Sequence, residues 1–264
     1  MRFLRSGSVW VGIVGALASP ARAEDVVLYG AGSLRGAMTE IVSAYTTATG
    51  HTVRTAFGPA GVMREKIEAG DHVDLFASAN MDHAQKLRDD GRAASVTLFA
   101  RNSLCAVALP DAKLTAENFA KQILEPAVKL GTSTPKADPA GDYTWEMFRR
   151  IDKSQPGAYA LLDKKAQKVF GGFAATGSDP ITGAFAHGDI NTLISYCSGA
   201  SAQARTLPNA QVVVIPTAIA PTPEYGLAIL SPANSAATSL AAAILSPTGQ
   251  AALEKAGFRR IDKP

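Results

Sequence analysis

Apolar positions along this chain alternate between the spacing of strands and the spacing of helices. A short apolar run, Val26–Tyr29, is typical of a strand, and small residues at 30–32 connect it to a helical pattern. That pattern places apolar side chains on one face at Leu34, Met38, Ile41, Val42 and Tyr45. The same order recurs at 52–70, where the small turn is Gly58–Gly61. We therefore predict two successive strand–helix units at the start of the fold.

A third unit of this kind stands later in the chain. A strand is predicted at 127–131, followed by a loop and an amphipathic helix from Asp142 to Ile151. A basic helix is predicted at 158–170, with its lysines on a solvated face. Further strands are predicted at 74–78, 99–110, 193–197, 212–216 and 225–230, and further helices at 82–90, 235–245 and 246–256. Such alternation is typical of the α/β class.

Each of the three units ends a strand at the start of a helix, which is an arrangement suited to binding anions. Ser33 stands at the position of an N-cap, where a hydroxyl meets the free N–H groups of the first turn. Two known motifs are absent here. Arg35 replaces the last glycine of the dinucleotide-binding motif G-x-G-x-x-G and also the last glycine of the serine-hydrolase motif G-x-S-x-G. Gly32 and Ser33 either simply cap a helix, as strand–helix units commonly require, or form part of an anion site. The absence of both motifs favours anion binding over catalysis.

The first 23 residues have the features of a secretory signal peptide. Arg2 and Arg5 precede an apolar segment at 9–18, and an A-x-A cleavage site ends at Ala23. The apolar segment is too short for a membrane-spanning helix, which needs about 20 residues. We therefore expect cleavage after Ala23 and export of a 241-residue mature protein to the periplasm.

The charge balance changes once that segment is set aside. It holds three arginines and no acid, which leaves 23 basic and 23 acidic residues in the mature chain. A nearly neutral protein gives no support for nucleic-acid binding. Two cysteines, Cys105 and Cys197, lie in predicted strands without metal-type spacing, and in an oxidising compartment they either pair as a disulfide or remain two buried thiols.

Five segments resemble the periplasmic molybdate-binding family, the substrate-binding components of molybdate ABC importers. They are L-Y-G-A-G-S-L at 28–34, M-R-E-K-I-E-A-G-D-H-V-D-L-F-A-S-A at 63–79, A-D-P-A-G-D-Y at 137–143, I-S-Y-C-S-G-A at 194–200 and L-S-P-T-G-Q-A-A-L-E-K-A-G-F at 245–258. They occur in order over the whole mature chain. The resemblance implies the two-lobed type II periplasmic binding protein fold, with the ligand held between two α/β lobes.

The resemblance also implies how the chain is divided between the lobes. Lobe one would hold residues 24–103 plus 214–264, and lobe two residues 104–213, with the two crossing strands near 102–105 and 210–213. Such a protein closes on its ligand like a hinge and presents the closed form to the permease of an ABC transporter. We expect a monomer that binds molybdate, tungstate or a related oxyanion and that needs no cofactor.

Family members hold a tetrahedral oxyanion with hydroxyl and backbone N–H groups. Matching positions imply that Ser33 donates its hydroxyl and N–H, Ala140 its N–H and Tyr196 its hydroxyl. Two positions depart from the family pattern. Ala60 and Gly61 replace a serine pair, so that only their backbone N–H groups remain, and Ser178 replaces an aliphatic residue that donates its N–H.

These departures leave other functions open. The same fold could bind sulfate, phosphate or a small organic acid, and an arginine buried in the cleft would favour a carboxylate. An exported serine hydrolase using Ser33 or Ser78 would need a histidine within hydrogen-bond reach. No nucleophile–base pair is visible and the histidines lack metal-site spacing, so we expect neither an enzyme nor a metal site. Asp138 and Asp142 are interpreted as cap and turn residues, and Arg35 as a surface residue.

Overall fold

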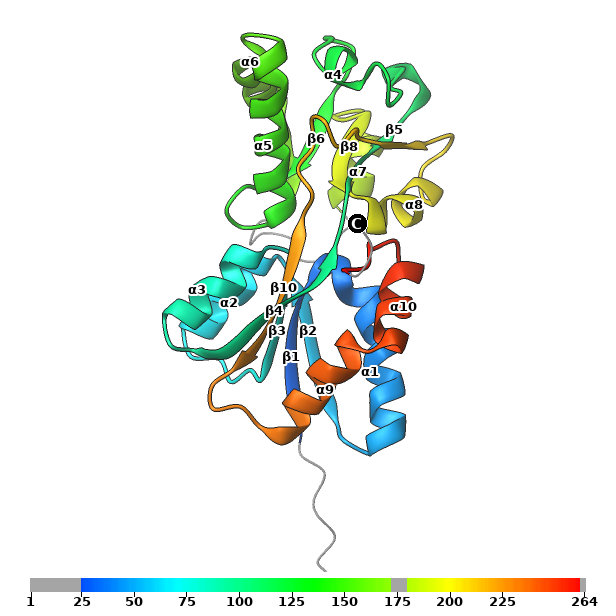
Figure 1. The fold of residues 1–264 in the computed structure, drawn as a ribbon. Helices are drawn as coiled ribbons and strands as arrows, with labels where there is room; N and C mark the ends of the chain where they lie inside the picture. Colours follow the sequence, from blue (N-terminus) through cyan, green and yellow to red (C-terminus); the bar gives the residue numbers. More distant parts are fainter. Residues whose placement is uncertain (1–24, 172–179, 262–264) are drawn as a thin grey trace, which may run out of the picture.

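The computed structural model describes residues 25–171 and 180–261 of the chain. Two five-stranded mixed sheets stand one above the other, each flanked by helices (Figure 1). We call the part built on the first sheet lobe one and the part built on the second sheet lobe two. The predicted α/β architecture of two lobes is confirmed, while the predicted signal peptide, residues 1–23, lies outside the described residues.

Lobe one has the strand order β2-β1-β3-β10-β4. Strand β1 runs parallel to both of its neighbours, β2 and β3. Strand β10 runs antiparallel to its neighbours, β3 and β4. Its strands are β1 (Val26–Ala31), β2 (Val53–Gly58), β3 (Leu75–Ser78), β4 (Ala93–Arg101) and β10 (Glu224–Leu230). Its helices are η1 (Gly32–Leu34), α1 (Arg35–Thr49), α2 (Ala60–Glu68), α3 (Met81–Asp89), α9 (Ser235–Leu245) and α10 (Pro247–Lys255). Helices α1, α9 and α10 cover one face of the sheet, and α2 and α3 cover the other (Figure 1).

Lobe two has the strand order β7-β6-β8-β5-β9. Its strands are β5 (Leu104–Ala108), β6 (Leu130–Ser133), β7 (Gln167–Phe170), β8 (Thr192–Tyr196) and β9 (Gln211–Val214). Its helices are η2 (Pro110–Ala112), α4 (Phe119–Gln122), α5 (Pro139–Ser154), α6 (Ala158–Lys165), α7 (Pro180–Ala186) and α8 (Cys197–Arg205). Every residue of β5 is buried, because helices cover both faces of this sheet.

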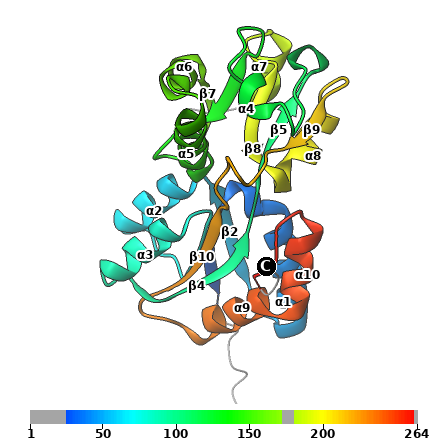
Figure 2. The same ribbon diagram turned by 45° about the horizontal axis from the view of Figure 1, so that its top comes forward.

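Two segments carry the chain between the sheets (Figure 2). Strand β4 ends at Arg101 and β5 begins at Leu104 in the other sheet. The chain returns through residues 215–223, between β9 and β10. The segment 210–213, where the second crossing was expected, lies instead almost entirely in β9, which pairs with β5 at the edge of the second sheet.

The topology brings several helix starts to the space between the lobes. Strands β1 and β2 lead into η1 and α2, and strands β6 and β8 lead into α5 and α8. Ligands of α/β sheets bind beyond the carboxyl ends of the strands, where such helices begin. The carboxyl ends of these strands in the two sheets therefore point toward the space between the lobes.

Three local predictions were wrong. The predicted helix 158–170 ends at Lys165, and residues 167–170 form β7, because pairing with β6 in a sheet overrides the local helical pattern. Cys197 is the first residue of α8 and follows the strand instead of lying in it. Ser33 makes no cap hydrogen bond, since α1 begins at Arg35 after the short helix η1.

Among residues 25–171 and 180–261, no helix has both the length and the apolar character needed to span a membrane.

Candidate functional site

A cavity of about 300 Å³ lies between the two lobes. Lobe one contributes the turns after β1 and β2, and lobe two contributes the start of α5 and the ends of β7 and β8. The lining residues include Gly32, Ser33, Arg35, Phe57, Gly58, Pro59, Asp138, Ala140, Phe170, Gly171, Tyr196 and Gly199. The structure thus brings three of the six predicted ligand-binding residues, Ser33, Ala140 and Tyr196, to one cavity.

A larger hollow of about 760 Å³ opens between α3 and α5. Its lining carries charges of both signs, among them Asp82, Asp142, Glu146, Lys136 and Arg149. None of the six predicted ligand-binding residues lines it. We place the candidate site in the smaller cavity, because the helix starts and the predicted residues converge there.

Tyr196 brings a hydroxyl group into the cavity from lobe two. It is the last residue of β8, and only 4% of its surface is exposed. Its hydroxyl has no hydrogen-bond partner among the described residues, although the Tyr225 ring lies edge-on with its centroid 5.7 Å away. Burial raises the pKa of this hydroxyl well above its usual value, so it remains a neutral donor. A buried, unpartnered hydroxyl beside a cavity is a natural donor for a ligand.

Ser33 approaches the cavity from lobe one, at the middle of η1. Its Oγ lies 3.0 Å from the hydroxyl oxygen of Tyr225, and not on the N–H groups of the following helix. Tyr225 in turn accepts a hydrogen bond from Asn102 Nδ2 at 3.1 Å. Ser33 is therefore connected to the segment that joins the lobes, a link that no local sequence pattern signals.

Ala140 and Asp138 form the lobe-two side of the cavity. The backbone N–H of Ala140 donates to Oδ1 of Asp138 at 3.1 Å, so Asp138 caps α5 as expected. The predicted donor N–H of Ala140 thus has an acceptor within the protein. Asp138 also lines the cavity, and burial raises the pKa of its carboxyl group. Asp138 was interpreted from the sequence only as a cap, and its place in the cavity lining was missed. The signal that could have shown this is its place directly before a helix start that was predicted to bind an anion.

Ala60 and Gly61 begin α2, and neither lines the cavity. The N–H of Gly61 donates to the carbonyl oxygen of Ala137 across the lobes at 3.2 Å. A Cβ atom on Gly61 would lie 2.5 Å from the carbonyl oxygen of Lys136 and 2.8 Å from that of Ala137. In this arrangement the start of α2 contacts lobe two directly, and only a glycine fits there.

The remaining predicted residues have different positions. Ser178 lies outside the described residues. Arg35, interpreted from the sequence as a surface residue, lies at the exposed rim of the cavity. Its guanidinium lies 5.0 Å from the centre of the Phe57 ring and donates a hydrogen bond to the Phe57 carbonyl oxygen at 3.3 Å. It places a positive charge at the entrance to the cavity.

Neither serine considered as a nucleophile has a histidine beside it in the described part of the chain. Ser33 contacts Tyr225, and Ser78 accepts a hydrogen bond from the backbone N–H of Asn80 at 3.2 Å. Over residues 25–171 and 180–261, no group of three or more metal-ligating side chains occurs either.

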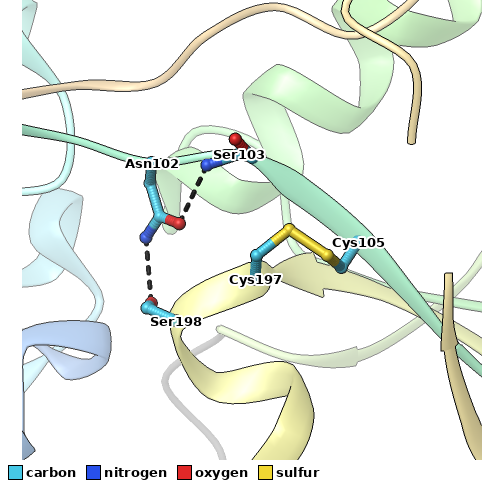
Figure 3. The surroundings of a disulfide bond; sticks show 5 residues. All are labelled: Asn102, Ser103, Cys105, Cys197 and Ser198. Carbon is cyan, nitrogen blue, oxygen red and sulfur yellow. Dashed lines mark hydrogen bonds between the residues drawn. A yellow bond between two sulfur atoms is a disulfide. The ribbon is translucent and has the colours of Figure 1, made fainter. Parts of the chain in front are cut away.

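A disulfide bond joins Cys105 of β5 to Cys197 of α8, which resolves the open alternative for these cysteines (Figure 3). The two residues are 92 positions apart in sequence, with Cα atoms 4.9 Å apart. The N–H of Cys197 also donates to the carbonyl oxygen of Ser103 at 2.9 Å. The bridge therefore attaches the start of β5 to the start of α8, directly after Tyr196.

Comparisons with known proteins show the family and the fold of this chain. Residues 26–259 match the family described as bacterial extracellular solute-binding protein. An uncharacterized protein of Pasteurella multocida is 39% identical over 143 residues, which cover 54% of this chain and 59% of that protein. The molybdate-binding protein ModA of Rhodobacter capsulatus is 29% identical over 181 residues, which cover 67% of this chain and 71% of ModA.

Solved structures show the same fold at low sequence identity. The periplasmic molybdate-binding protein of Azotobacter vinelandii has a TM-score of 0.70 and 16% identity, with 88% of this chain and 98% of that chain covered. The sulfate-binding protein SubI of Mycobacterium tuberculosis has a TM-score of 0.73 and 18% identity, with 90% and 88% covered. Both share the fold of this chain, and one is a molybdate-binding protein whereas the other is a sulfate-binding protein.

Proposed function

Because this chain belongs to the bacterial extracellular solute-binding protein family, we propose that it captures molybdate or tungstate between its lobes and delivers the anion to an ABC importer. The protein would act in the periplasm as a monomeric receptor, without catalysis. Relatives named as molybdate-binding proteins support molybdate as the first candidate, and a sulfate-binding structural neighbour makes sulfate the first competitor.

The observation that carries this proposal is the pair of hydroxyl groups that two different lobes bring to one cavity. Ser33 comes from lobe one and Tyr196 from lobe two, and the buried Tyr196 hydroxyl makes no hydrogen bond with any residue that the structure describes. Neutral hydroxyl and N–H donors stabilise an anion without the cost of burying an opposite charge. A ligand bound by both would hold the lobes together, which is the state that a permease recognises in such transporters.

Calorimetry of the purified mature protein with molybdate, tungstate, sulfate and phosphate tests this function. We expect molybdate and tungstate to bind, and Tyr196→Phe to weaken binding by about 10- to 100-fold, the range for a hydrogen bond to a charged group. Tyr45→Phe is the matched control, because its buried hydroxyl donates to the carbonyl oxygen of Ala236, away from the cavity. Absence of binding by all four anions would overturn the proposal.

A small organic acid is the second candidate, and two observations favour it. Arg35 stands at the exposed rim of the cavity, and the planar fork of its guanidinium suits a carboxylate. The volume of about 300 Å³ also reaches the lower end of the range of about 300–1,000 Å³ typical of organic ligands. Adding hydroxy and phosphorylated organic acids to the same calorimetric series decides between the two, since only an organic ligand should depend strongly on Arg35.

A further inference from the structure

The connecting segment between the lobes is joined to the candidate site by a chain of side-chain hydrogen bonds. Asn102 stands between β4 and β5, and its side chain is fully buried. Its Nδ2 donates to Ser198 Oγ at 2.9 Å and to the Tyr225 hydroxyl at 3.1 Å. Tyr225 then contacts Ser33 Oγ at 3.0 Å. The chain runs from the hinge, through lobe one, to the cavity.

The orientation of the Asn102 amide is determined by its neighbours. Its Oδ1 accepts the backbone N–H of Ser103 at 2.9 Å (Figure 3). A flipped amide would place its NH₂ group against that N–H, so that two donors would face each other. Nδ2 therefore faces Tyr225 and can only donate, because an amide nitrogen is not an acceptor.

This orientation determines the direction of the next bond. Tyr225 is fully buried and its hydroxyl must donate its own proton to some acceptor. Among the described residues its hydrogen bonds join it to Asn102 Nδ2, which cannot accept, and to Ser33 Oγ, which can. The neighbouring Tyr196 hydroxyl makes no hydrogen bond of normal length with any of these residues, so Ser33 Oγ is the acceptor. The Ser33 hydroxyl then has its own proton free to point elsewhere, and the cavity lies beside it.

We propose that Tyr225 is a positioning residue that makes the Ser33 hydroxyl a dedicated donor toward the bound anion. This inference rests on the proposed function, since it assigns the direction of one of its ligand contacts. The consequence for specificity is that the ligand atom at Ser33 must be a hydrogen-bond acceptor, as an unprotonated oxygen of an oxyanion or carboxylate is. A protonated oxygen or a neutral hydroxyl would be a poorer fit at this position.

The hinge takes part in this arrangement. Asn102 N–H donates to the carbonyl oxygen of Pro223 in the other crossing segment at 2.9 Å, and Asn102 Nδ2 reaches Ser198 in lobe two. Asn102 is thus held by the other crossing segment through its backbone and by lobe two through the same amide that orients Tyr225.

A double-mutant cycle separates a positioning role from a structural one. Ser33→Ala should raise the Kd for molybdate by about 10- to 100-fold, and Tyr225→Phe by about 3- to 10-fold. If Tyr225 acts through Ser33, adding Tyr225→Phe to Ser33→Ala should not raise the Kd further. The phenylalanine ring should stay packed, because the Tyr225 ring is held between Phe99 and Phe258, with centroids 6.2 and 5.3 Å away.

Tyr45→Phe is again the control, because it removes a buried tyrosine hydroxyl of lobe one that does not touch the cavity. It should lower thermal stability by an amount similar to Tyr225→Phe and leave the Kd unchanged. Fully additive effects of Ser33→Ala and Tyr225→Phe on the Kd, or an unchanged Kd in Tyr225→Phe, would overturn the inference. In either case, molybdate binding by the wild-type protein would leave the proposed function intact.

Proton NMR of the ligand-free protein supplies a readout that does not depend on binding. The Tyr225 hydroxyl proton should exchange slowly and show a nuclear Overhauser effect to the β protons of Ser33, and this signal should be absent in Tyr225→Phe. A hydroxyl proton of Ser33 directed at Tyr225 instead would refute the direction of the chain. If no anion binds but this signal is found, the proposed function fails and the orientation of Ser33 stands.

Discussion

Replacing Gly61 with alanine tests whether direct backbone contact between the lobes stabilises the closed form. The new Cβ atom would lie 2.5 Å from the Lys136 carbonyl oxygen and 2.8 Å from that of Ala137, and both obstacles are backbone atoms. Relief requires the lobes to separate, which also breaks the hydrogen bond of 3.2 Å from Gly61 to Ala137.

The magnitude follows from these two losses. Overpacking of this kind costs about 1–3 kcal/mol, and a hydrogen bond contributes about 1 kcal/mol net. The closed form should therefore lose about 2–4 kcal/mol relative to the open form. Since a ligand held by both lobes binds the closed form, its affinity should fall by about 30- to 700-fold.

The assay is calorimetry with molybdate, or with whichever tested anion binds the wild-type protein, together with small-angle scattering of the ligand-free protein. Gly36→Ala is the matched control, because it lies in α1 and a Cβ there meets nothing within 4 Å. Gly36→Ala should leave the affinity unchanged and keep or gain thermal stability, since alanine is the better helix former by about 1 kcal/mol. An unchanged affinity and radius of gyration in Gly61→Ala would refute the reasoning.

Three further predictions concern charge, covalent linkage and packing. Burial raises the pKa of Asp138, so the folded protein favours the protonated carboxyl group. The folding stability that this group contributes should therefore fall as pH rises through the raised pKa. The affinity for an anion beside it should fall over the same pH range, because the carboxylate that forms repels the anion. Asp138→Asn keeps a good helix cap and should flatten the pH profile of Kd, and an unchanged profile would contradict a role for this carboxyl. Changing Cys105 and Cys197 together to serine should lower the free energy of unfolding by about 2–5 kcal/mol in denaturant titration, whereas an unchanged midpoint would show that the bridge adds nothing. Phe148→Ala, at a fully buried position of α5, should cost about 3–5 kcal/mol in the same titration, and a loss below about 1 kcal/mol would mean that lobe two repacks.

Local patterns in the sequence determined most of the elements of this protein. Period-two and helical spacings identified β1, α1 and the terminal helices α9 and α10, because each pattern reports which face of an element is buried. Asp138 was recognisable as a cap from its position alone, since a cap acts on its own first turn. The α/β class and the likeness to two-lobed binding proteins were therefore accessible from the chain itself.

The tertiary structure decided everything that depends on partners distant in sequence. Residues 167–170 form strand β7 because they pair with β6 in the second sheet. Cys105 and Cys197 form a disulfide because β5 lies beside β8, the strand that Cys197 follows. The contact of Gly61 with Ala137 and the bond of Ser33 with Tyr225 each join parts of the chain that no local pattern links. Hydrogen bonding and steric fit act over about 3 Å of space regardless of sequence separation, so these features exist only once both lobes are assembled.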